Sequence, residues 1–224
     1  MNKRMHSIAK YMEAGRGVID VGTDHGYFPV WMATHGYKGN IIASDINAAP
    51  LKRAMDTARE AGVLNKIQFQ LCDGLDNCDP ESVDTIVIAG MGGELICRIL
   101  DRAEWCMHRH YKLILQPMTK SEVLRYWLVN NEFEICTEDL ILEGGTIYQM
   151  IVARFGGVTR LNDAELFIGK KDLCMDPELY GMQRQKQIKR FESAIDGMEK
   201  NSSGKQPPAL DLYRQILSEM KRMG

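Results

Sequence analysis

Short runs rich in β-branched residues alternate with amphipathic segments through the first 130 residues of this 224-residue chain. The expected strands are 17–22, 40–45, 66–74, 83–90 and 111–116, and the expected helices are 27–35, 47–61, 93–103 and 121–130. Strands separated by helices are joined by right-handed crossovers and therefore run parallel. The third and fourth runs are rich in Val, Ile and Phe, as strands buried on both faces are. The alternation predicts an α/β fold with helices packed around a parallel sheet.

The pattern changes from residue 132 onward. Residues 132–155 hold two strand-like runs joined by Glu143-Gly144-Gly145-Thr146, where glycine supplies the positive φ of a tight turn. We expect an antiparallel hairpin that closes a seven-stranded, mostly parallel sheet. No strand-like run follows Asp163, and the sequence predicts a helix over 176–200, a linker over 201–208 and a helix over 209–223. We therefore divide the chain into a sheet domain, 1–158, and a helical C-terminal domain, 159–224.

Helical spacing in the C-terminal region predicts the face by which its two helices pair in antiparallel fashion. The residues on this face are Leu179, Met182, Gln185, Ile188, Phe191 and Ile195.

The first expected strand ends in a loop that carries two acids and two glycines. Glycine after a buried strand lets the backbone turn sharply and approach a ligand, and open α/β sheets bind ligands beyond the carboxyl ends of their strands. Gly22 and Gly26 are four residues apart and do not form the G-x-G-x-x-G loop that cradles a pyrophosphate. The carboxylates of Asp20 and Asp24 suit a cofactor with an ammonium and a sulfonium instead. The alternative is a plain turn with solvated acids.

Three further strand ends carry acids or glycines. Asp45 lies about twenty residues beyond the glycine loop, where an acid can bind a ribose diol, although an acid at a helix N-terminus is the simpler explanation. Asp73-Gly74 could receive an adenine ring, or it could be an ordinary turn. The glycines of AGMGGE (89–94) could leave space where a methyl group would point, or they could mark a glycine-rich helix start. The candidate cofactor residues are Asp20, Gly22, Thr23, Asp45, Ile46, Asp73, Gly74, Leu75, Gly90 and Met91.

The segments DVGTDHGYFP, DGL, IVIAGMGG and LILQP, in this order, resemble those of the bacterial tRNA (adenine-22-N1)-methyltransferases. The motifs cover about residues 2 to 155, and the remainder is similar in architecture alone. The resemblance implies a Rossmann-like class I methyltransferase domain with a helical, coiled-coil-like C-terminal domain. It also implies S-adenosyl-L-methionine as cofactor and methylation of N1 of an adenosine at position 22, in the D-arm region of tRNA. Met118 and Ser44-Asp45 depart from the family pattern, but the acid that would bind ribose is kept.

Methylation of adenine N1 needs no strong general base, because this nitrogen has an in-plane lone pair. The reaction depends on alignment with the methyl group and on an acceptor that stabilises the positive charge of the product. Asp24 is the candidate for that acceptor, and His25 or Tyr27 would position the base. The fourth strand is not followed by the N-P-P-[YF] turn that grips an exocyclic amine.

Two basic groups are candidates for RNA contact, one near the N-terminus around Arg4 and one between Gly181 and Phe191. A solvated helix face is the simpler explanation of such runs. The candidate substrate residues are Arg4, Gly92, Gly93, Gln116, Pro117, Arg184, Lys186, Lys189 and Arg190.

The formal net charge of −2 excludes a uniformly basic nucleic-acid binder but allows local basic patches. No apolar run reaches the ~20 residues of a membrane span, and the N-terminus does not have the pattern of a signal peptide, so we expect a cytoplasmic protein with no membrane partner. The cysteines and histidines lack metal-ligand spacing, so we expect no metal. The oligomeric state is left open. Two alternatives to this function remain. The protein could be a methyltransferase for another RNA or a small molecule, or a non-catalytic RNA-binding module with the same fold. A nicotinamide dehydrogenase is disfavoured, because the G-x-G-x-x-G loop is missing.

Overall fold

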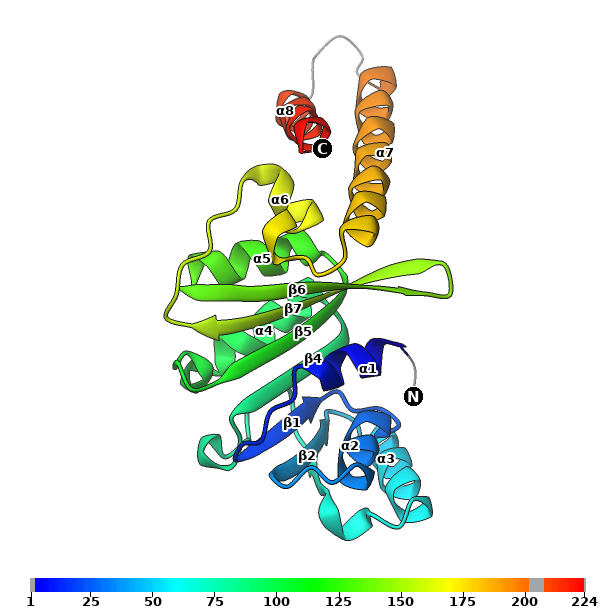
Figure 1. Ribbon diagram of the computed structural model, residues 1–224, viewed down its shortest axis with the longest axis vertical. Coiled ribbons are helices and arrows are strands. Elements are labelled where there is room, and N and C mark those ends of the chain that lie inside the picture. The colour runs from blue at the N-terminus through cyan, green and yellow to red at the C-terminus, as the bar shows by residue number, and fades with distance from the viewer. Residues whose placement is uncertain (1–2, 202–207, 224) are drawn as a thin grey trace.

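A computed structural model describes residues 3–201 and 208–223. The chain forms a seven-stranded sheet of order β3-β2-β1-β4-β5-β7-β6 (Figure 1). Strands β1 to β5 pair in parallel, and β7 runs antiparallel to both β5 and β6. The predicted fold class is therefore confirmed. The strands are β1 Gly17–Val21, β2 Asn40–Asp45, β3 Gln68–Leu71, β4 Thr85–Gly92, β5 Lys112–Thr119, β6 Phe133–Glu143 and β7 Thr146–Phe155.

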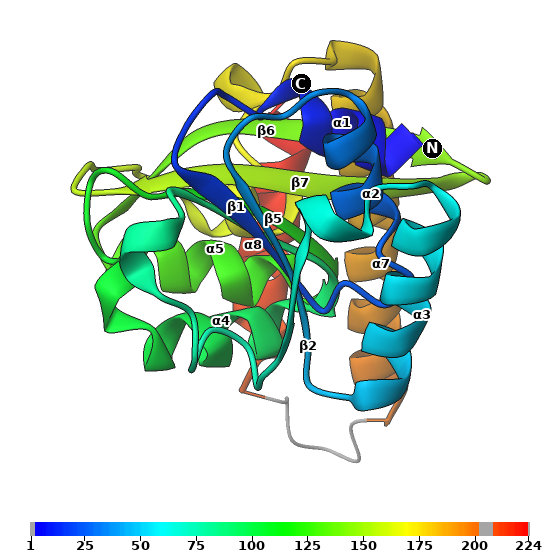
Figure 2. The same ribbon diagram turned by 90° about the horizontal axis from the view of Figure 1, so that it is seen from below.

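Helices cover both faces of the sheet (Figures 1 and 2). Val18 and Ile19 are consecutive in β1, so their side chains point to opposite faces and enter different apolar clusters. The Val18 cluster includes Ile8, Phe28 and Ala58 from the helices on its face, and the Ile19 cluster includes residues of the helices on the other. The first face carries α1 Lys3–Lys10, α2 Tyr27–Thr34 and α3 Ala48–Glu60, and the second carries α4 Gly93–Arg102 and α5 Ser121–Asn130.

The expectation that the third strand is buried on both faces is wrong. β3 pairs with β2 alone and lies at the edge of the sheet. Gln68 is exposed, Phe69 and Gln70 are half-buried, and Leu71 is 55% exposed. Its alternation of glutamine with apolar residues fits an edge strand that is only partly covered.

The predicted hairpin is confirmed and its turn is built on glycine. Gly144 and Gly145 have φ values of 56° and 77°, and positive φ at both central residues is the requirement of a tight type I′ turn. Glu143, just before the turn, accepts hydrogen bonds from the Lys3 amide at 2.7 Å and from Arg4 Nε at 2.9 Å. These hydrogen bonds therefore fix helix α1 against the hairpin, beside the ends of β4 and β5.

The C-terminal region is helical, as predicted, with α6 Asp163–Ile168, α7 Pro177–Asn201 and α8 Leu210–Arg222. Helices α7 and α8 pack against each other beyond β6 (Figure 1). Residues 202–207 of the predicted linker lie outside the described residues. The predicted domain boundary falls between β7 and α6, in a segment without regular structure.

The predicted pairing face of the long helix is partly wrong. Met182 and Gln185 are exposed, whereas Tyr180, Gln183 and Gln187 are buried. Helix α7 contacts α6 and β6 as well as α8, so its buried surface is wider than a two-helix seam and is turned toward the sheet.

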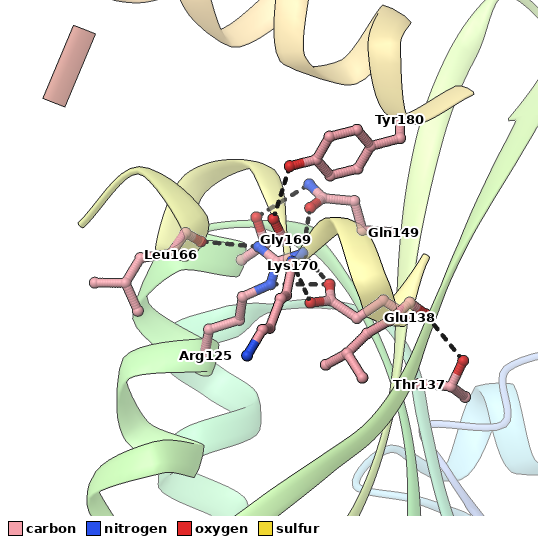
Figure 3. Close-up of polar contacts among 10 residues, drawn as sticks. Arg125, Thr137, Glu138, Gln149, Leu166, Gly169, Lys170 and Tyr180 are labelled. Atoms are coloured by element: carbon pink, nitrogen blue, oxygen red, sulfur yellow. Dashed lines mark hydrogen bonds and ion pairs between the residues drawn. The ribbon is translucent and has the colours of Figure 1, made fainter. Parts of the chain in front are cut away.

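A buried ion pair joins the sheet to the C-terminal helices (Figure 3). Arg125 of α5 is fully buried and donates from Nε to Glu138 of β6 at 2.9 Å. It also donates to the carbonyl of Leu166 in α6 at 2.8 Å and to the side-chain oxygen of Gln149 at 2.7 Å. Glu138 accepts the backbone N–H of Lys170 at 3.2 Å. We call this group the Arg125–Glu138 clasp, because it connects α5, β6, β7 and the segment after α6.

Within the described part of the chain, no helix has the length and apolar character that crossing a membrane requires.

Candidate active site

A cavity of about 210 Å³ opens at the carboxyl ends of β1, β4 and β5. The sheet reverses its strand order between β1 and β4, and such a switch point is where open α/β sheets bind ligands. Residues of the β1 loop face residues of the β4 and β5 ends, and α1 and the start of α2 close the sides. The predicted residues that line it are Arg4, Asp20, Gly22, Thr23, Asp24, His25, Tyr27, Gly90 and Gln116.

Asp20 places a buried carboxyl group in this cavity. It is 8% exposed, and Thr23 Oγ1 donates to its Oδ2 at 2.7 Å. Burial raises the pKa of Asp20 to about 6, and the nearby Asp45 carboxylate adds to the increase. Among the residues that the structure describes, Asp20 has this one hydroxyl donor and no basic partner. Such a buried carboxylate is suited to bind a cation.

Hydrogen bonds to β2 fix the loop after β1. The Gly22 and Thr23 amides donate to the Ser44 carbonyl at 2.8 and 2.9 Å. Gly22 has a φ of 73°, and a Cβ there would lie 2.2 Å from Met91 Cε. The positive φ favours glycine at this position, and the side chain of Met91, a predicted cofactor residue, packs on the loop.

Backbone amides orient the carboxylate of Asp45 beside the cavity. It is 8% exposed and accepts from the Asp24 amide at 3.3 Å and the Asn47 amide at 2.9 Å. Ile46, the next residue, is 59% exposed. A fixed carboxylate followed by an exposed apolar side chain suits a ribose diol and the flat face of its base.

Asp73 has a partner that the sequence did not reveal. Arg102 of α4 binds its carboxylate at 2.9 Å and its carbonyl at 3.0 Å, and this guanidinium lowers the pKa of Asp73. Gly74 has a φ of 62° and a Cβ there would lie 2.9 Å from Ile99. Leu75 is 1% exposed and its side chain belongs to the core cluster of α4 and α5. The side chain of Leu75 therefore serves the core, and any ligand contact there falls to the backbone.

The predicted catalytic residues lie together at the cavity mouth. Asp24 has a φ of 49°, and its carboxylate lies 2.7 Å from Arg53 Nη2 and 3.7 Å from His25 Nε2. The rings of His25 and Tyr27 are stacked, with centroids 5.3 Å apart and an interplanar angle of 7°. Tyr27 is 53% exposed, so a flat aromatic face is open to a planar ligand. Arg53 is a site residue that sequence reasoning missed.

The glycines at the end of β4 and the start of α4 have different roles. A Cβ at Gly90 would meet nothing within 4 Å, and the Gly90 amide donates to the buried Gln116 at 3.2 Å. Gly92 precedes α4 as its N-cap. A Cβ at Gly93 would lie 2.2 Å from the Lys120 carbonyl, so Gly93 allows close backbone packing. Its contact with substrate stays a prediction.

The predicted basic residues lie in four different places. The Arg4 guanidinium lies 4.5 Å above the ring of Tyr148 at the cavity wall. Lys186 and Arg190, with Pro117, line a larger groove. Arg184, predicted to bind substrate, donates to the Met220 carbonyl at 2.8 Å and caps the end of α8, and its contact with substrate stays a prediction. Lys189 is exposed and lies outside the groove lining.

Neither metal ligation nor a disulfide accompanies the site. Among residues 3–201 and 208–223, no three His, Cys, Asp or Glu side chains are grouped as ligands of an ion. All six cysteines are free thiols.

A doubly wound sheet that ends in an antiparallel hairpin, with an acid-lined cavity at its switch point, is the architecture of the class I methyltransferases. Residues 1–151 match the methyltransferase domain model, and the chain belongs to that family.

Several proteins of known sequence or structure are similar to this chain. The tRNA (adenine(22)-N(1))-methyltransferase of Bacillus subtilis is 31% identical over 156 residues, which span 70% of this chain and 66% of that protein, just under two thirds. Streptococcus pneumoniae Sp1610, to which tRNA (m1A22) methyltransferase activity is attributed, has a crystal structure with S-adenosyl-L-methionine. It is 28% identical, with a TM-score of 0.82 over 98% of this chain and 99% of that one. The TrmK structure of M. capricolum shares the fold at 23% identity, with a TM-score of 0.83 over 100% and 97%. The predicted family resemblance is confirmed.

Proposed function

We propose that this protein transfers the methyl group of S-adenosyl-L-methionine to N1 of an adenosine in tRNA, at position 22 in the D-arm region. The observation that carries the proposal is the buried Asp20 carboxyl group at the sheet's switch point, with Asp45 fixed beside it. The named activities of the similar proteins support the same conclusion.

The donor set fits the cofactor. Asp20, with a pKa raised by burial, gains a favourable partner from an ammonium group, and the carboxylate of Asp45 retains lone pairs for the ribose hydroxyls. Ile46 offers an apolar surface to the base, and the open space at Gly90 leaves room near the sulfur. When bound, S-adenosyl-L-methionine supplies an activated methyl group.

The residues at the mouth act on the methyl acceptor. Adenine N1 lies inside a base pair or a stack, so the target nucleotide must be turned out into the cavity. The exposed Tyr27 ring, stacked with His25, provides a face against which that base lies. Asp24 stabilises the positive charge that develops on the methylated ring, although Arg53 shares its carboxylate and moderates its effect.

Contact with the rest of the RNA falls to Arg4 and to Lys186 and Arg190 on α7, whose charges suit phosphates. For a protein that acts on tRNA we propose a cytoplasmic location.

The decisive experiment is incubation with unmodified tRNA transcripts and labelled cofactor, followed by mapping of the label and mass spectrometry of the nucleosides. We expect 1-methyladenosine at position 22. A transcript with guanosine at that position should be inert, because guanine N1 carries a proton. Label in another RNA, in a small molecule or in a different nucleoside would support the alternative methyltransferase. Tight tRNA binding without any transfer would indicate a non-catalytic RNA-binding protein.

A further inference from the structure

A groove of about 850 Å³ adjoins the active-site cavity. Its walls are the end of β5 from Pro117, the β7 strand around Tyr148 and the α7 helix from Gln183 to Arg190. The volume falls within the range of about 300 to 1,000 Å³ that is usual for sites of small ligands. Arg4 lines the cavity and its Nη1 lies 4.0 Å from Sδ of Met118, which lines the groove, so the two hollows meet at the end of β5.

One side-chain pair forms the boundary between cavity and groove. Arg4 lines the cavity, Tyr148 lines the groove, and the Arg4 guanidinium lies 4.5 Å above the Tyr148 ring. Glu143 holds Arg4 in place at 2.9 Å. A polymer that leaves the cavity along β5 therefore passes this cation and this ring before it reaches the groove.

The charge of the groove is positive. Lys120, Lys186 and Arg190 line it together with a single carboxylate, that of Glu122. The Glu122 side chain is 16% exposed and lies 4.0 Å from Arg190. Three cations against one mostly covered carboxylate suit the phosphates of a nucleic acid.

Buried amides give the groove a hydrogen-bonding wall. Gln183 is 1% exposed, and within the described part of the chain its side-chain oxygen has no hydrogen-bond partner. Gln187 is 7% exposed, and its oxygen accepts a long bond of 3.4 Å from Arg190. A buried carbonyl that lacks a donor is unfavourable, so a ligand that brings an N–H group favours a rotation of the Gln183 amide toward the groove.

On the basis of the function proposed above, we propose that the groove binds a nucleotide directly adjacent to the methylated adenosine and reads its base. Turning the target out of its stack also frees the neighbouring nucleotide, and unstacked bases are recognised at their edges. Lys186 and Arg190 contact the phosphates, and Gln183 accepts from an exocyclic amine. The groove therefore prefers adenine or cytosine, which carry an amine at the position where guanine and uracil carry a carbonyl.

The phosphate contact is tested by binding alone. Lys186 and Lys189 are both exposed on α7, but only Lys186 lines the groove, so Lys186→Gln and Lys189→Gln form a matched pair. Fluorescence anisotropy with an unmodified tRNA transcript at several salt concentrations gives the slope of log Kd against log salt. Loss of one phosphate contact reduces that slope by about 1. We expect this reduction in Lys186→Gln alone, with unchanged affinity for S-adenosylhomocysteine in both variants. Equal slopes in the two variants would overturn the phosphate path.

The base contact is tested with transcripts that differ at the nucleotides on either side of the target. In the wild type, kcat/KM should be about 10-fold higher with adenine or cytosine than with guanine or uracil at one of these positions, as expected for one base-edge contact. Gln183→Met should bring that ratio close to 1, whereas Gln185→Met, on the exposed side of α7, should preserve it. A ratio near 1 in the wild type, or an unchanged ratio in Gln183→Met, would refute the reading of the base.

The two proposals fail in different ways. If no transcript is methylated, the proposed function fails, and the anisotropy slopes still decide whether RNA follows the groove. If transcripts are methylated but neither the slope nor the ratio depends on the groove residues, only the present proposal fails.

Discussion

Replacement of Asp20 by asparagine isolates the effect of one buried charge. Asparagine keeps the size of the side chain and an oxygen that accepts from Thr23 Oγ1, but it cannot ionise. Burial raises the pKa of Asp20 from 3.8 to about 6. At 1.36 kcal/mol per pKa unit, ionised Asp20 destabilises the ligand-free fold by roughly 3 kcal/mol.

The sign of the pH dependence follows from that raised pKa. Between about pH 4 and pH 6 the folded protein holds a proton that the unfolded chain has lost, so stability falls as the pH rises and is level above pH 6. Asp20→Asn removes this dependence. The variant should be more stable than the wild type at neutral pH by up to about 3 kcal/mol, and the difference should shrink as the pH falls toward 4.

Affinity for the cofactor should increase with pH, whereas the stability of the ligand-free protein decreases. The ionised carboxylate attracts an ammonium group, so wild-type affinity for S-adenosylhomocysteine should rise as the pH passes through 6 and then level off. Asp20→Asn should bind more weakly and show no such rise.

Urea unfolding at acidic and neutral pH measures the stability difference, and isothermal titration calorimetry measures the affinity. Thr23→Val is a useful control, because loss of the hydroxyl donor that stabilises the carboxylate should raise the pKa of Asp20 further and destabilise the ligand-free protein at neutral pH. Equal stability of the wild type and Asp20→Asn at neutral pH, with equal affinity, would refute the reasoning.

Three other substitutions test the site and the fold. Asp45→Ala should lose about 1.5–3 kcal/mol of S-adenosylhomocysteine binding in calorimetry, the scale of hydrogen bonds to a charged group, and unchanged affinity in a folded variant would exclude the ribose contact. Asp24→Asn should lower turnover on tRNA about tenfold, less than a fully buried group would, because its side chain is 61% exposed and paired with Arg53; near wild-type turnover would remove Asp24 from the mechanism. Glu138→Gln leaves the buried Arg125 without a carboxylate and should destabilise the protein by about 3–5 kcal/mol in urea unfolding. The double variant Arg125→Met/Glu138→Leu should recover most of this loss, and a loss below about 1 kcal/mol in Glu138→Gln would show that the charge pair is dispensable.

Much of the fold was predictable because its strands and turns depend on local patterns. The apolar runs located β1, β2, β4 and β5, and the two glycines of the hairpin located the turn between β6 and β7 to the residue. The edge position of β3 was not predictable in this way, because strand order depends on which helix crosses which face. Composition gave a hint, since Gln68 and Gln70 are unusual in a strand covered on both sides.

The acidic residues of the site could be predicted from the sequence, but the arginines that bind them could not. Strand ends brought Asp20, Asp24 and Asp45 together because parallel strands finish at one edge. Arg53 and Arg102 were missed, and each lies 29 residues from the aspartate that it binds. A spacing of that length across a crossover depends on helix length and packing angle, which a single sequence does not specify.

In the proposed binding of tRNA, the Arg125–Glu138 clasp limits how far the protein can adapt. A movement of α6 away from the sheet would pull the Leu166 carbonyl from Arg125 and strain a buried charge pair. Helix α7 packs against α6 and β6, so the helices behave as a rigid extension of the sheet. The distance between the cavity and the cations of α7 is therefore fixed before the protein meets its RNA substrate. The conformational work falls on the nucleic acid, and transcripts whose target region is stiffened by additional base pairs should bind more weakly than flexible ones.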